Sequence, residues 1–163
     1  MKIVYIDSQN IHKSIEELWW IIDWELFYKY LCKKFEVQEI KIFLWYVKKY
    51  EIFYKRLKEI WYNVILKESM ILENWNIKWN VDIDIAIHVI LDIYETNLEK
   101  AYLVTWDWDY NTLVNLLKSR KLLWRVLIPN RKKASKLLKK SAWADIQILE
   151  DLRYFLEKTK SFE

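Results

Sequence analysis

Residues 101–109 read Ala101-Tyr102-Leu103-Val104-Thr105-Trp106-Asp107-Trp108-Asp109, an apolar run followed at once by acids. The run 101–104 is typical of a buried strand. Similar apolar, β-branched runs recur along the chain and alternate with segments of helical periodicity. This alternation predicts an α/β protein with three layers, in which helices cover both faces of a central, mainly parallel sheet.

The expected elements follow from this alternation. Strands are predicted at 2–6, 40–46, 62–66, 101–104 and 124–128, with an edge strand at 146–148. Helices are predicted at 11–18, 23–35, 48–60, 109–119 and 132–141, with a closing helix near 150–158. The length and the lack of a linker predict a single domain over residues 1–163.

The segment 81–92 has two interpretations. Its isoleucines alternate with acids, which favours a strand by period alone. A connection is needed between the strands on either side, and this need favours a helix. As a helix, the segment is apolar around most of its circumference, which predicts a buried crossover helix.

The composition is unusual, since 163 residues contain 11 tryptophans and no glycine. Average usage would give about eleven glycines. Most of the tryptophans lie at expected turns and caps, where a positive φ often requires glycine. We hypothesise that the gene reads UGA as glycine and was translated with UGA as tryptophan, at Trp19, Trp45, Trp61, Trp75, Trp79, Trp106, Trp108, Trp124 and Trp143. Trp20 and Trp24 are interpreted as authentic, and the alternative is a genuinely tryptophan-rich surface that stacks on bases or sugars.

The bulk properties narrow the class of protein. The hydrophobic fraction of 53% with 31% charged residues excludes a disordered chain. No apolar run reaches membrane-spanning length, and no signal-like segment precedes the first strand, so we expect a cytoplasmic protein without a membrane partner. The single cysteine, Cys32, forms no intrachain disulfide and is expected to be a packed thiol.

Acids follow two of the predicted strands. Asp7 follows the first strand, and Asp107 and Asp109 follow the fourth. The carboxyl ends of parallel strands meet at one crevice, and Asp82 would reach it if the helix of 81–92 begins at the same edge. Carboxylates about 4 Å apart repel by about 4 kcal/mol per pair in an intermediate dielectric. A divalent cation removes this repulsion, and oxygen ligands favour Mg²⁺ or Mn²⁺.

Each acid also has a structural interpretation. Asp7, Asn10 and Asp109 could cap the helices that follow them. Asp82 could be a solvated acid in a first helical turn, favoured by the helix dipole. The residue pattern alone therefore supports a metal site without establishing it.

Three motifs resemble those of NYN domains, the LabA-like branch of the PIN-like ribonucleases. Residues 6–10 (Ile-Asp-Ser-Gln-Asn) resemble the family's I-D-G-x-N signature, with serine where glycine is usual. Residues 78–83 resemble its K-G-x-D segment with one extra residue, and residues 105–110 resemble its S/T-G-D-x-D-F/Y motif. The stretch 125–138 resembles its last strand and helix. One departure is His88, which stands where many relatives place another aspartate.

The resemblance implies a PIN-like fold and a metal-dependent endoribonuclease. Mg²⁺ or Mn²⁺ would be held by Asp7, Asp82, Asp107 and Asp109, and would activate water and stabilise charge on the phosphate. Asn10 and Thr105 would orient these ligands or the phosphate. The substrate would be RNA, with DNA not excluded.

Two other function classes remain open. One is a catalytically weak NYN-type module that binds RNA or a protein partner, with the site eroded by His88, Trp106 and Trp108. The other is a metal-dependent phosphatase. The absence of an Asp-x-Asp pair directly after the first strand argues against this class. Self-association into a homodimer is also open.

Positive charge concentrates in the last third of the chain. Four of these residues are predicted to contact a nucleic-acid backbone, namely Arg131, Lys132, Lys133 and Lys136. The alternative is that they form the solvated face of the helix expected at 132–141.

Overall fold

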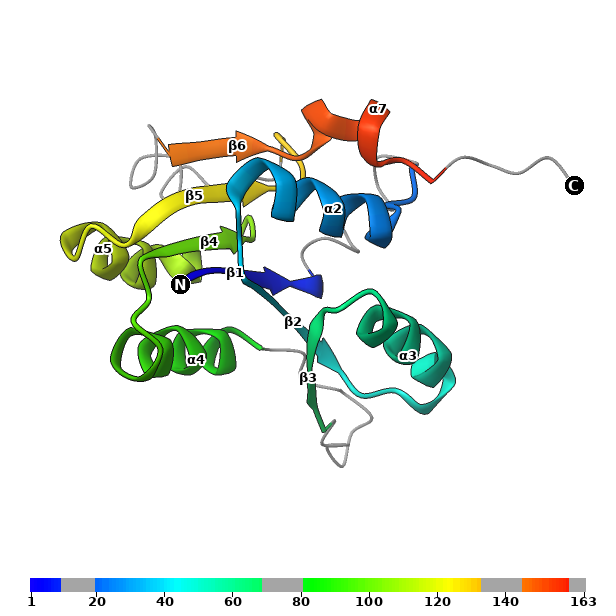
Figure 1. The fold of residues 1–163 in the computed structure, drawn as a ribbon, viewed down its shortest axis with the longest axis horizontal. Coiled ribbons are helices and arrows are strands. Elements are labelled where there is room, and N and C mark those ends of the chain that lie inside the picture. Colours follow the sequence, from blue (N-terminus) through cyan, green and yellow to red (C-terminus); the bar gives the residue numbers. More distant parts are fainter. Residues whose placement is uncertain (10–19, 69–80, 133–144, 159–163) are drawn as a thin grey trace, which may run out of the picture.

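A computed structural model describes residues 1–9, 20–68, 81–132 and 145–158. Six parallel strands form one sheet in the order β3-β2-β1-β4-β5-β6 (Figure 1). The strands are β1 (Lys2–Asp7), β2 (Glu39–Trp45), β3 (Asn63–Lys67), β4 (Lys100–Val104), β5 (Leu123–Ile128) and β6 (Ile146–Ile148). The predicted parallel sheet is confirmed, and each predicted strand agrees with the structure to within one residue at either end.

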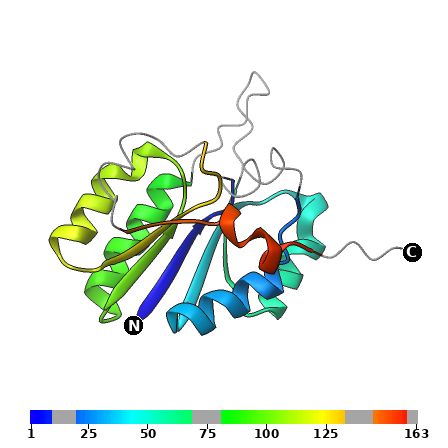
Figure 2. The same cartoon turned by 90° about the horizontal axis from the view of Figure 1, so that it is seen from above.

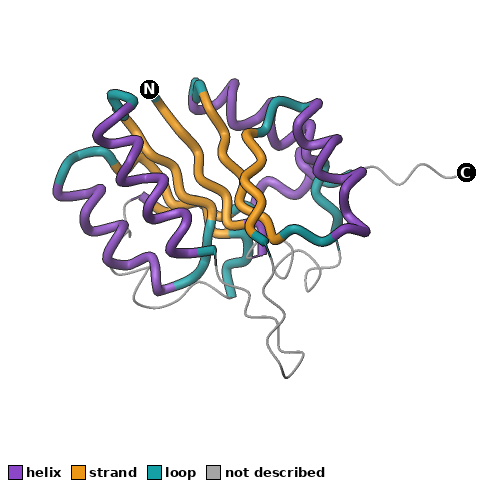
Figure 3. Tube along the Cα trace, turned by 90° about the horizontal axis from the view of Figure 1, so that it is seen from below, coloured by secondary structure: helices purple, strands orange, loops and turns teal. Residues whose placement is uncertain are grey.

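Helices cover both faces of this sheet (Figures 2 and 3). On one face lie α4 (Asp82–Glu95) and α5 (Asn111–Ser119), the latter preceded by the 3₁₀ turn η2 (Trp108–Tyr110). On the other face lie α2 (Trp24–Phe35), α3 (Glu51–Glu59) and the short α7 (Arg153–Leu156). The 3₁₀ turns η1 (Lys48–Tyr50) and η4 (Glu150–Leu152) precede α3 and α7. The helices expected at 11–18 and over most of 132–141 lie outside the described residues.

β1 and β4, at the centre of the sheet, are buried on both faces, which explains their uninterrupted apolar runs at 3–6 and 101–104. In β1, Ile3 and Tyr5 belong to the core beneath α4 and α5, while Val4 and Ile6 belong to the core beneath α2 and α3. All four side chains are at most 1% exposed. This arrangement confirms the predicted three-layer architecture.

The direction of winding reverses between β1 and β4. From β1 the chain proceeds outward through β2 to β3, and α4 then carries it back across the sheet to β4, on the other side of β1. β1 and β4 pair directly, with Ile6 opposite Val104. Beyond the carboxyl ends of these two adjacent strands, the chain continues toward opposite edges of the sheet. Such a place is a topological switch point, where open α/β sheets form their ligand crevice.

The ambiguous segment 81–92 is helical, as predicted. Ile85 and Val89 of α4 face the sheet and are at most 2% exposed. The prediction that this helix is buried around its circumference is wrong for the described part of the molecule. Ile83 is 66% exposed and Ile87 is 48% exposed, because α4 lies in an outer layer and only its inner face contacts the sheet.

A buried charged network fixes the far end of α4 to the sheet. The Lys41 ammonium lies 2.8 and 2.7 Å from the two carboxylate oxygens of Asp92. The Tyr5 hydroxyl donates to the same carboxylate at 2.8 Å. Burial, reinforced by the Asp92 carboxylate, raises the pKa of Tyr5 well above its usual value, so the hydroxyl keeps its proton. Lys41 and Tyr5 are directly opposite each other in β2 and β1, so the network joins two strands and a helix.

Trp61 has the left-handed backbone that the recoding hypothesis requires. Its φ is 82° at the residue after the C-cap of α3. The Trp61 N–H donates to the Lys58 carbonyl, and the Tyr62 N–H donates to the Leu57 carbonyl, which together form a Schellman motif. Glycine is the usual residue at this position because a Cβ is disfavoured there. The Trp61 side chain is 79% exposed, so its burial offsets little of this conformational cost.

Among the described residues, the other tryptophans of the hypothesis give no such signal. Trp45, Trp106, Trp108 and Trp124 all have negative φ, and two of them lie within β2 and β5. Trp19, Trp75, Trp79 and Trp143 lie outside the described residues. Of the two interpreted as authentic, Trp20 is buried and Trp24 packs against Phe53 and Tyr62. The backbone therefore supports the hypothesis at one position, and the codons would decide the rest.

Trp61→Gly is expected to raise the free energy of unfolding by about 1 kcal/mol, because it relieves a left-handed conformation that costs a residue with a Cβ about 1–2 kcal/mol. Denaturant unfolding would measure the change. Trp108→Gly is the matched control, since Trp108 is also exposed but has negative φ. No gain, or a loss, at Trp61 would contradict the argument from backbone conformation.

Candidate active site

Four acids lie at or near the switch point. Asp7 is the last residue of β1 and is 3% exposed. Asp107 and Asp109 follow β4, and Asp82 is the first residue of α4. Asp82, Asp107 and Asp109 each place a carboxylate oxygen within 4.8 Å of the others. The structure thus brings three of the four predicted acids together, from two segments that are distant in the sequence.

Asp107 is held by local backbone hydrogen bonds. Its N–H donates to the Thr105 hydroxyl at 3.1 Å. Its Oδ1 accepts from the Asp109 N–H at 3.1 Å, so Asp107, rather than Asp109, caps the turn η2. Thr105 is itself buried. A cap uses only one of the two carboxylate oxygens, so capping and metal binding are compatible at this residue.

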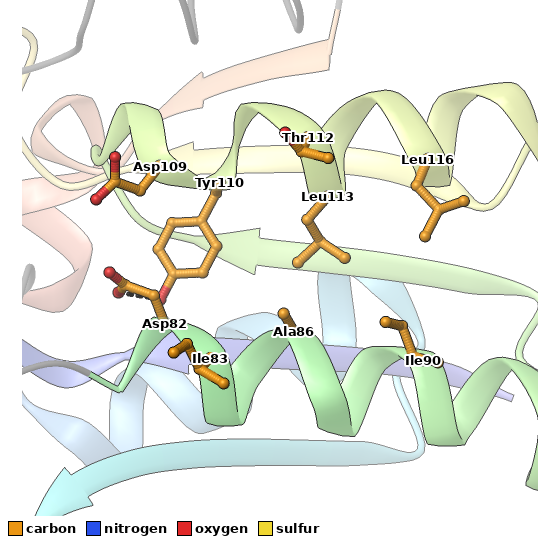
Figure 4. A pocket seen from close by; sticks show the side chains of 9 residues that line it. All are labelled: Asp82, Ile83, Ala86, Ile90, Asp109, Tyr110, Thr112, Leu113 and Leu116. Carbon is orange, nitrogen blue, oxygen red and sulfur yellow. Dashed lines mark hydrogen bonds between the residues drawn. The ribbon is translucent and has the colours of Figure 1, made fainter.

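The fourth acid, Asp7, is linked to the cluster through Tyr110. The Tyr110 hydroxyl lies 2.7 Å from Asp82 Oδ1 and 3.2 Å from Asp7 Oδ2. Figure 4 shows the phenol ring extending from the start of α5 toward Asp82, with Asp109 beside it. A hydroxyl has one proton, so Tyr110 can donate to Asp82 or to Asp7 but not to both at once, and the shorter distance favours Asp82. The phenol lies between two carboxylates that would otherwise repel each other.

The environment of Tyr110 keeps that proton in place. Burial raises the pKa of Tyr110 far above its usual value, and the negative charges of Asp7 and Asp82 raise it further. Tyr110 is only 2% exposed. Tyr110 is a site residue that the sequence did not predict, although its position directly after Asp109 offered a signal.

Ser8 and His88, which both depart from the motifs of the family, make contacts in the structure. Ser8, where the resembling motif has glycine, donates from its hydroxyl to the Phe43 carbonyl at 2.6 Å. The His88 ring packs edge-on against the Phe43 ring, with 5.2 Å between centroids. Among the described residues, the cluster of possible metal ligands consists of Asp82, Asp107 and Asp109 and does not include His88. This favours the interpretation of His88 as a packed residue. Asn10 lies outside the described residues.

The predicted basic contacts are only partly described. The Arg131 guanidinium lies 2.9 and 2.8 Å from the two carboxylate oxygens of Asp151. The Lys132 N–H donates to Asn130 Oδ1, and the Lys132 side chain is exposed. Lys133 and Lys136 lie outside the described residues. A phosphate would therefore compete with Asp151 for Arg131, whereas no acid of the described residues pairs with Lys132.

A groove of about 340 Å³ runs between α4 and α5 and begins at the acids. Figure 4 shows Asp82, Asp109 and Tyr110 at one end, with Thr112 and aliphatic side chains along the rest. The aliphatic side chains include Ile83 and Ile90 of α4. From α5 they include Leu113 and Leu116. The groove is thus polar at the switch point and apolar away from it.

The fold and the position of the acids agree with the PIN-like class that the motifs indicate. The family model of the NYN domain matches residues 2–148, and the chain belongs to this family. A protein of unknown function from Vibrio parahaemolyticus has a similar crystal structure, with a TM-score of 0.77 and 21% sequence identity. The match covers 95% of this chain and 94% of that one, and it supports the fold alone.

The comparison with curated proteins gives no match. The LabA-like branch therefore stays a prediction. In the part of the chain that the structure describes, no helix combines the length and the apolarity needed to cross a membrane.

Proposed function

We propose that this NYN domain is a metal-dependent endoribonuclease that hydrolyses phosphodiester bonds of RNA. The observation that supports this most is the convergence of three carboxylates within 4.8 Å at the switch point of the sheet. Structural aspartates are usually separated or paired with cations, because like charges at this distance repel. NYN membership supports a nuclease-like activity, and the acids supply the chemistry that such an activity needs.

The donor set fits a divalent cation. Asp82, Asp107 and Asp109 offer only oxygen, which Mg²⁺ and Mn²⁺ prefer. We assign these three residues as ligands and Asp7 as a fourth acid of the centre. When bound, the ion would supply Lewis-acid stabilisation of the phosphate and a water of lowered pKa. No residue of the described site is arranged as a covalent nucleophile, so water is the attacking group in this proposal.

Several side chains would keep the ligands in place. Thr105 and the Asp109 N–H fix Asp107, and Tyr110 holds Asp7 and Asp82 in a fixed relation to each other. Such supporting contacts typically affect metal affinity or activity by 10- to 100-fold. By the family resemblance, Asn10 would have a similar orienting role.

A second candidate function is a catalytically weak NYN module that binds RNA or a protein partner. The observation in its favour is the pair of indoles around Asp107. Trp106 packs against the core beneath α5, and Trp108 is 56% exposed beside the acids. An exposed indole so close to the carboxylates would hinder the approach of a phosphate.

A cleavage assay distinguishes the two functions. Purified protein is incubated with single-stranded RNA in Mn²⁺ or Mg²⁺, in a chelator, and with DNA of the same sequence. The nuclease proposal expects metal-dependent internal cleavage that the chelator removes, and preference for RNA would identify the substrate class. RNA binding without cleavage, in a variant carrying glycine at both Trp106 and Trp108, would favour the binding module.

Charge reversal at Lys132, Lys133 and Lys136 is expected to weaken RNA binding and to flatten its salt dependence. Each lost phosphate contact removes about 0.7 from the slope of log K against log salt for single strands. Reversal of Lys55 and Lys58, which are exposed on α3, is the control and should leave the slope unchanged. An unaltered slope in the first variant would assign these lysines to ordinary solvated surface.

A further inference from the structure

The outward face of α4 is apolar along its whole length. It carries five exposed residues at helical spacing, which we call the α4 stripe: Ile83, Ile87, Ile90, Leu91 and Tyr94. Their exposed fractions range from 41% for Ile90 to 73% for Tyr94. The stripe lies opposite the buried face formed by Ile85, Val89 and Asp92.

A surface helix normally buries one apolar face and presents charge on the other. α3 follows this rule, since it exposes acids and bases with only Ile52 among them as a strongly exposed aliphatic residue. The α4 stripe contains no charged residue. Contiguous exposed apolar surface of this kind marks an interaction site more often than it marks ordinary solvated surface.

The stripe also adjoins a groove of matching chemistry. Ile83 and Ile90 belong both to the stripe and to the apolar groove between α4 and α5 (Figure 4). The surface therefore has a ridge, formed by α4, next to a groove. A ridge beside a groove can be complementary to itself about a two-fold axis, because each copy inserts its ridge into the groove of the other.

Charge at the two ends of α4 fixes the orientation of such a pair. The N-terminal end has Asp82 and Asp109, whereas at the C-terminal end the Arg120 guanidinium lies over the Tyr94 ring at 5.9 Å. Exposed Lys118 and Lys121 flank Arg120 in the sequence, and Lys118 lies 3.9 Å from Asp145. Glu95 is an exposed acid at the same end of α4, so bases outnumber acids there by three to two. The two ends are about 18 Å apart along the helix axis. In an antiparallel arrangement each acidic end faces a basic end, whereas a parallel one would place like charges together.

We propose that the protein forms a two-fold homodimer in which the α4 stripes of two copies pack antiparallel. In this dimer Arg120 of the second copy lies near the acidic cluster of the first. The acidic site is thereby supplied with a cation from outside its own chain. The inference concerns assembly and does not rest on the proposed nuclease activity.

Sedimentation equilibrium over a wide concentration series tests the dimer. The parent is expected to show a monomer–dimer equilibrium, and Ile87→Lys is expected to weaken it by roughly a hundredfold, because each dimer buries the new charge twice. Ile52→Lys, at the 86% exposed isoleucine of α3, is the matched control and should leave the equilibrium unchanged. Circular dichroism and thermal unfolding of each variant check that both remain folded.

Three results would overturn the dimer. If the parent protein stays monomeric at all concentrations, the stripe contacts another part of this chain or a different partner. A dimer that is unaffected by Ile87→Lys would place the interface elsewhere. Equal weakening by Ile52→Lys would show that added charge, rather than loss of the stripe, has changed the association.

The orientation has its own test. Arg120→Glu is expected to weaken the dimer by about tenfold, more strongly at low salt, since it places a further acid against the acidic end of the other copy. Lys55→Glu, on the exposed face of α3, is the control. An Arg120→Glu dimer as tight as the parent would overturn the antiparallel arrangement.

Discussion

Asp107→Asn is expected to reduce metal-stimulated RNA cleavage by at least about a hundredfold, and Asp82→Asn should do the same. Each change removes a charged oxygen from a centre expected to contribute several kcal/mol of transition-state stabilisation. The fold should persist, because asparagine keeps an oxygen that can accept the hydrogen bonds received at both positions. Initial cleavage rates at saturating Mn²⁺, with thermal unfolding in parallel, would measure the two effects.

The metal-free variants provide the control. Removing one of three mutually repelling charges should leave the free energy of unfolding unchanged or raised when chelator is present. Glu59→Gln changes an acid that pairs with Lys55 on α3, away from the cluster, and it should keep the parent rate. Parent-level cleavage by Asp107→Asn would remove Asp107 from the proposed centre. Equal loss by Glu59→Gln would point to a general effect of charge.

Lys41→Met is expected to lower the free energy of unfolding by about 3–5 kcal/mol. The substitution removes the cation and leaves the buried Asp92 carboxylate with the Tyr5 hydroxyl as its partner among the described residues. Removing one partner of a buried ion pair typically destabilises a protein by this amount. Asp92→Asn should be milder, since Lys41 also lies 3.8 Å from the partly exposed Glu39. Urea unfolding of the metal-free protein would measure both.

A combined variant separates charge from packing. Lys41→Met, Asp92→Leu and Tyr5→Phe together replace the whole network with apolar side chains of similar size. Such replacements are often neutral or stabilising, so the triple variant should be more stable than Lys41→Met alone. A triple variant no more stable than the single one, or a single variant within about 1 kcal/mol of the parent, would contradict the assigned role of this network.

The sheet was predictable from local sequence because its central strands are buried on both faces. Continuous apolar, β-branched runs bounded by polar residues are a strong signal, and the strand ends fixed the positions of Asp7 and Asp107. The rule that parallel strands share one carboxyl edge predicted that Asp7 and Asp107 lie at one crevice, and Asp82 was included on the condition that the helix of 81–92 begins there. The structure groups Asp82, Asp107 and Asp109, and Tyr110 links Asp7 to Asp82.

Contacts between distant residues were not predictable in the same way. Tyr5 and Asp92 are 87 residues apart. The apolar strand around Lys41 indicates that this residue is buried, but nothing near it in the sequence indicates that Asp92 is its partner. The apolar circumference of α4 was interpreted as burial, whereas its outer isoleucines are exposed in the described protein. Periodicity reports how apolar a face is, but it does not report what covers that face.

The attachment of α4 at Asp92 makes the acidic site sensitive to events far from it. Asp82 lies about 15 Å along the helix from that attachment. A tilt of about 4° around the Asp92 end would move the start of the helix by about 1 Å, a displacement that can cost a hundredfold in rate. A screen for lost activity would therefore recover substitutions at Lys41 and Tyr5, in the middle of the sheet, along with substitutions of the acids themselves.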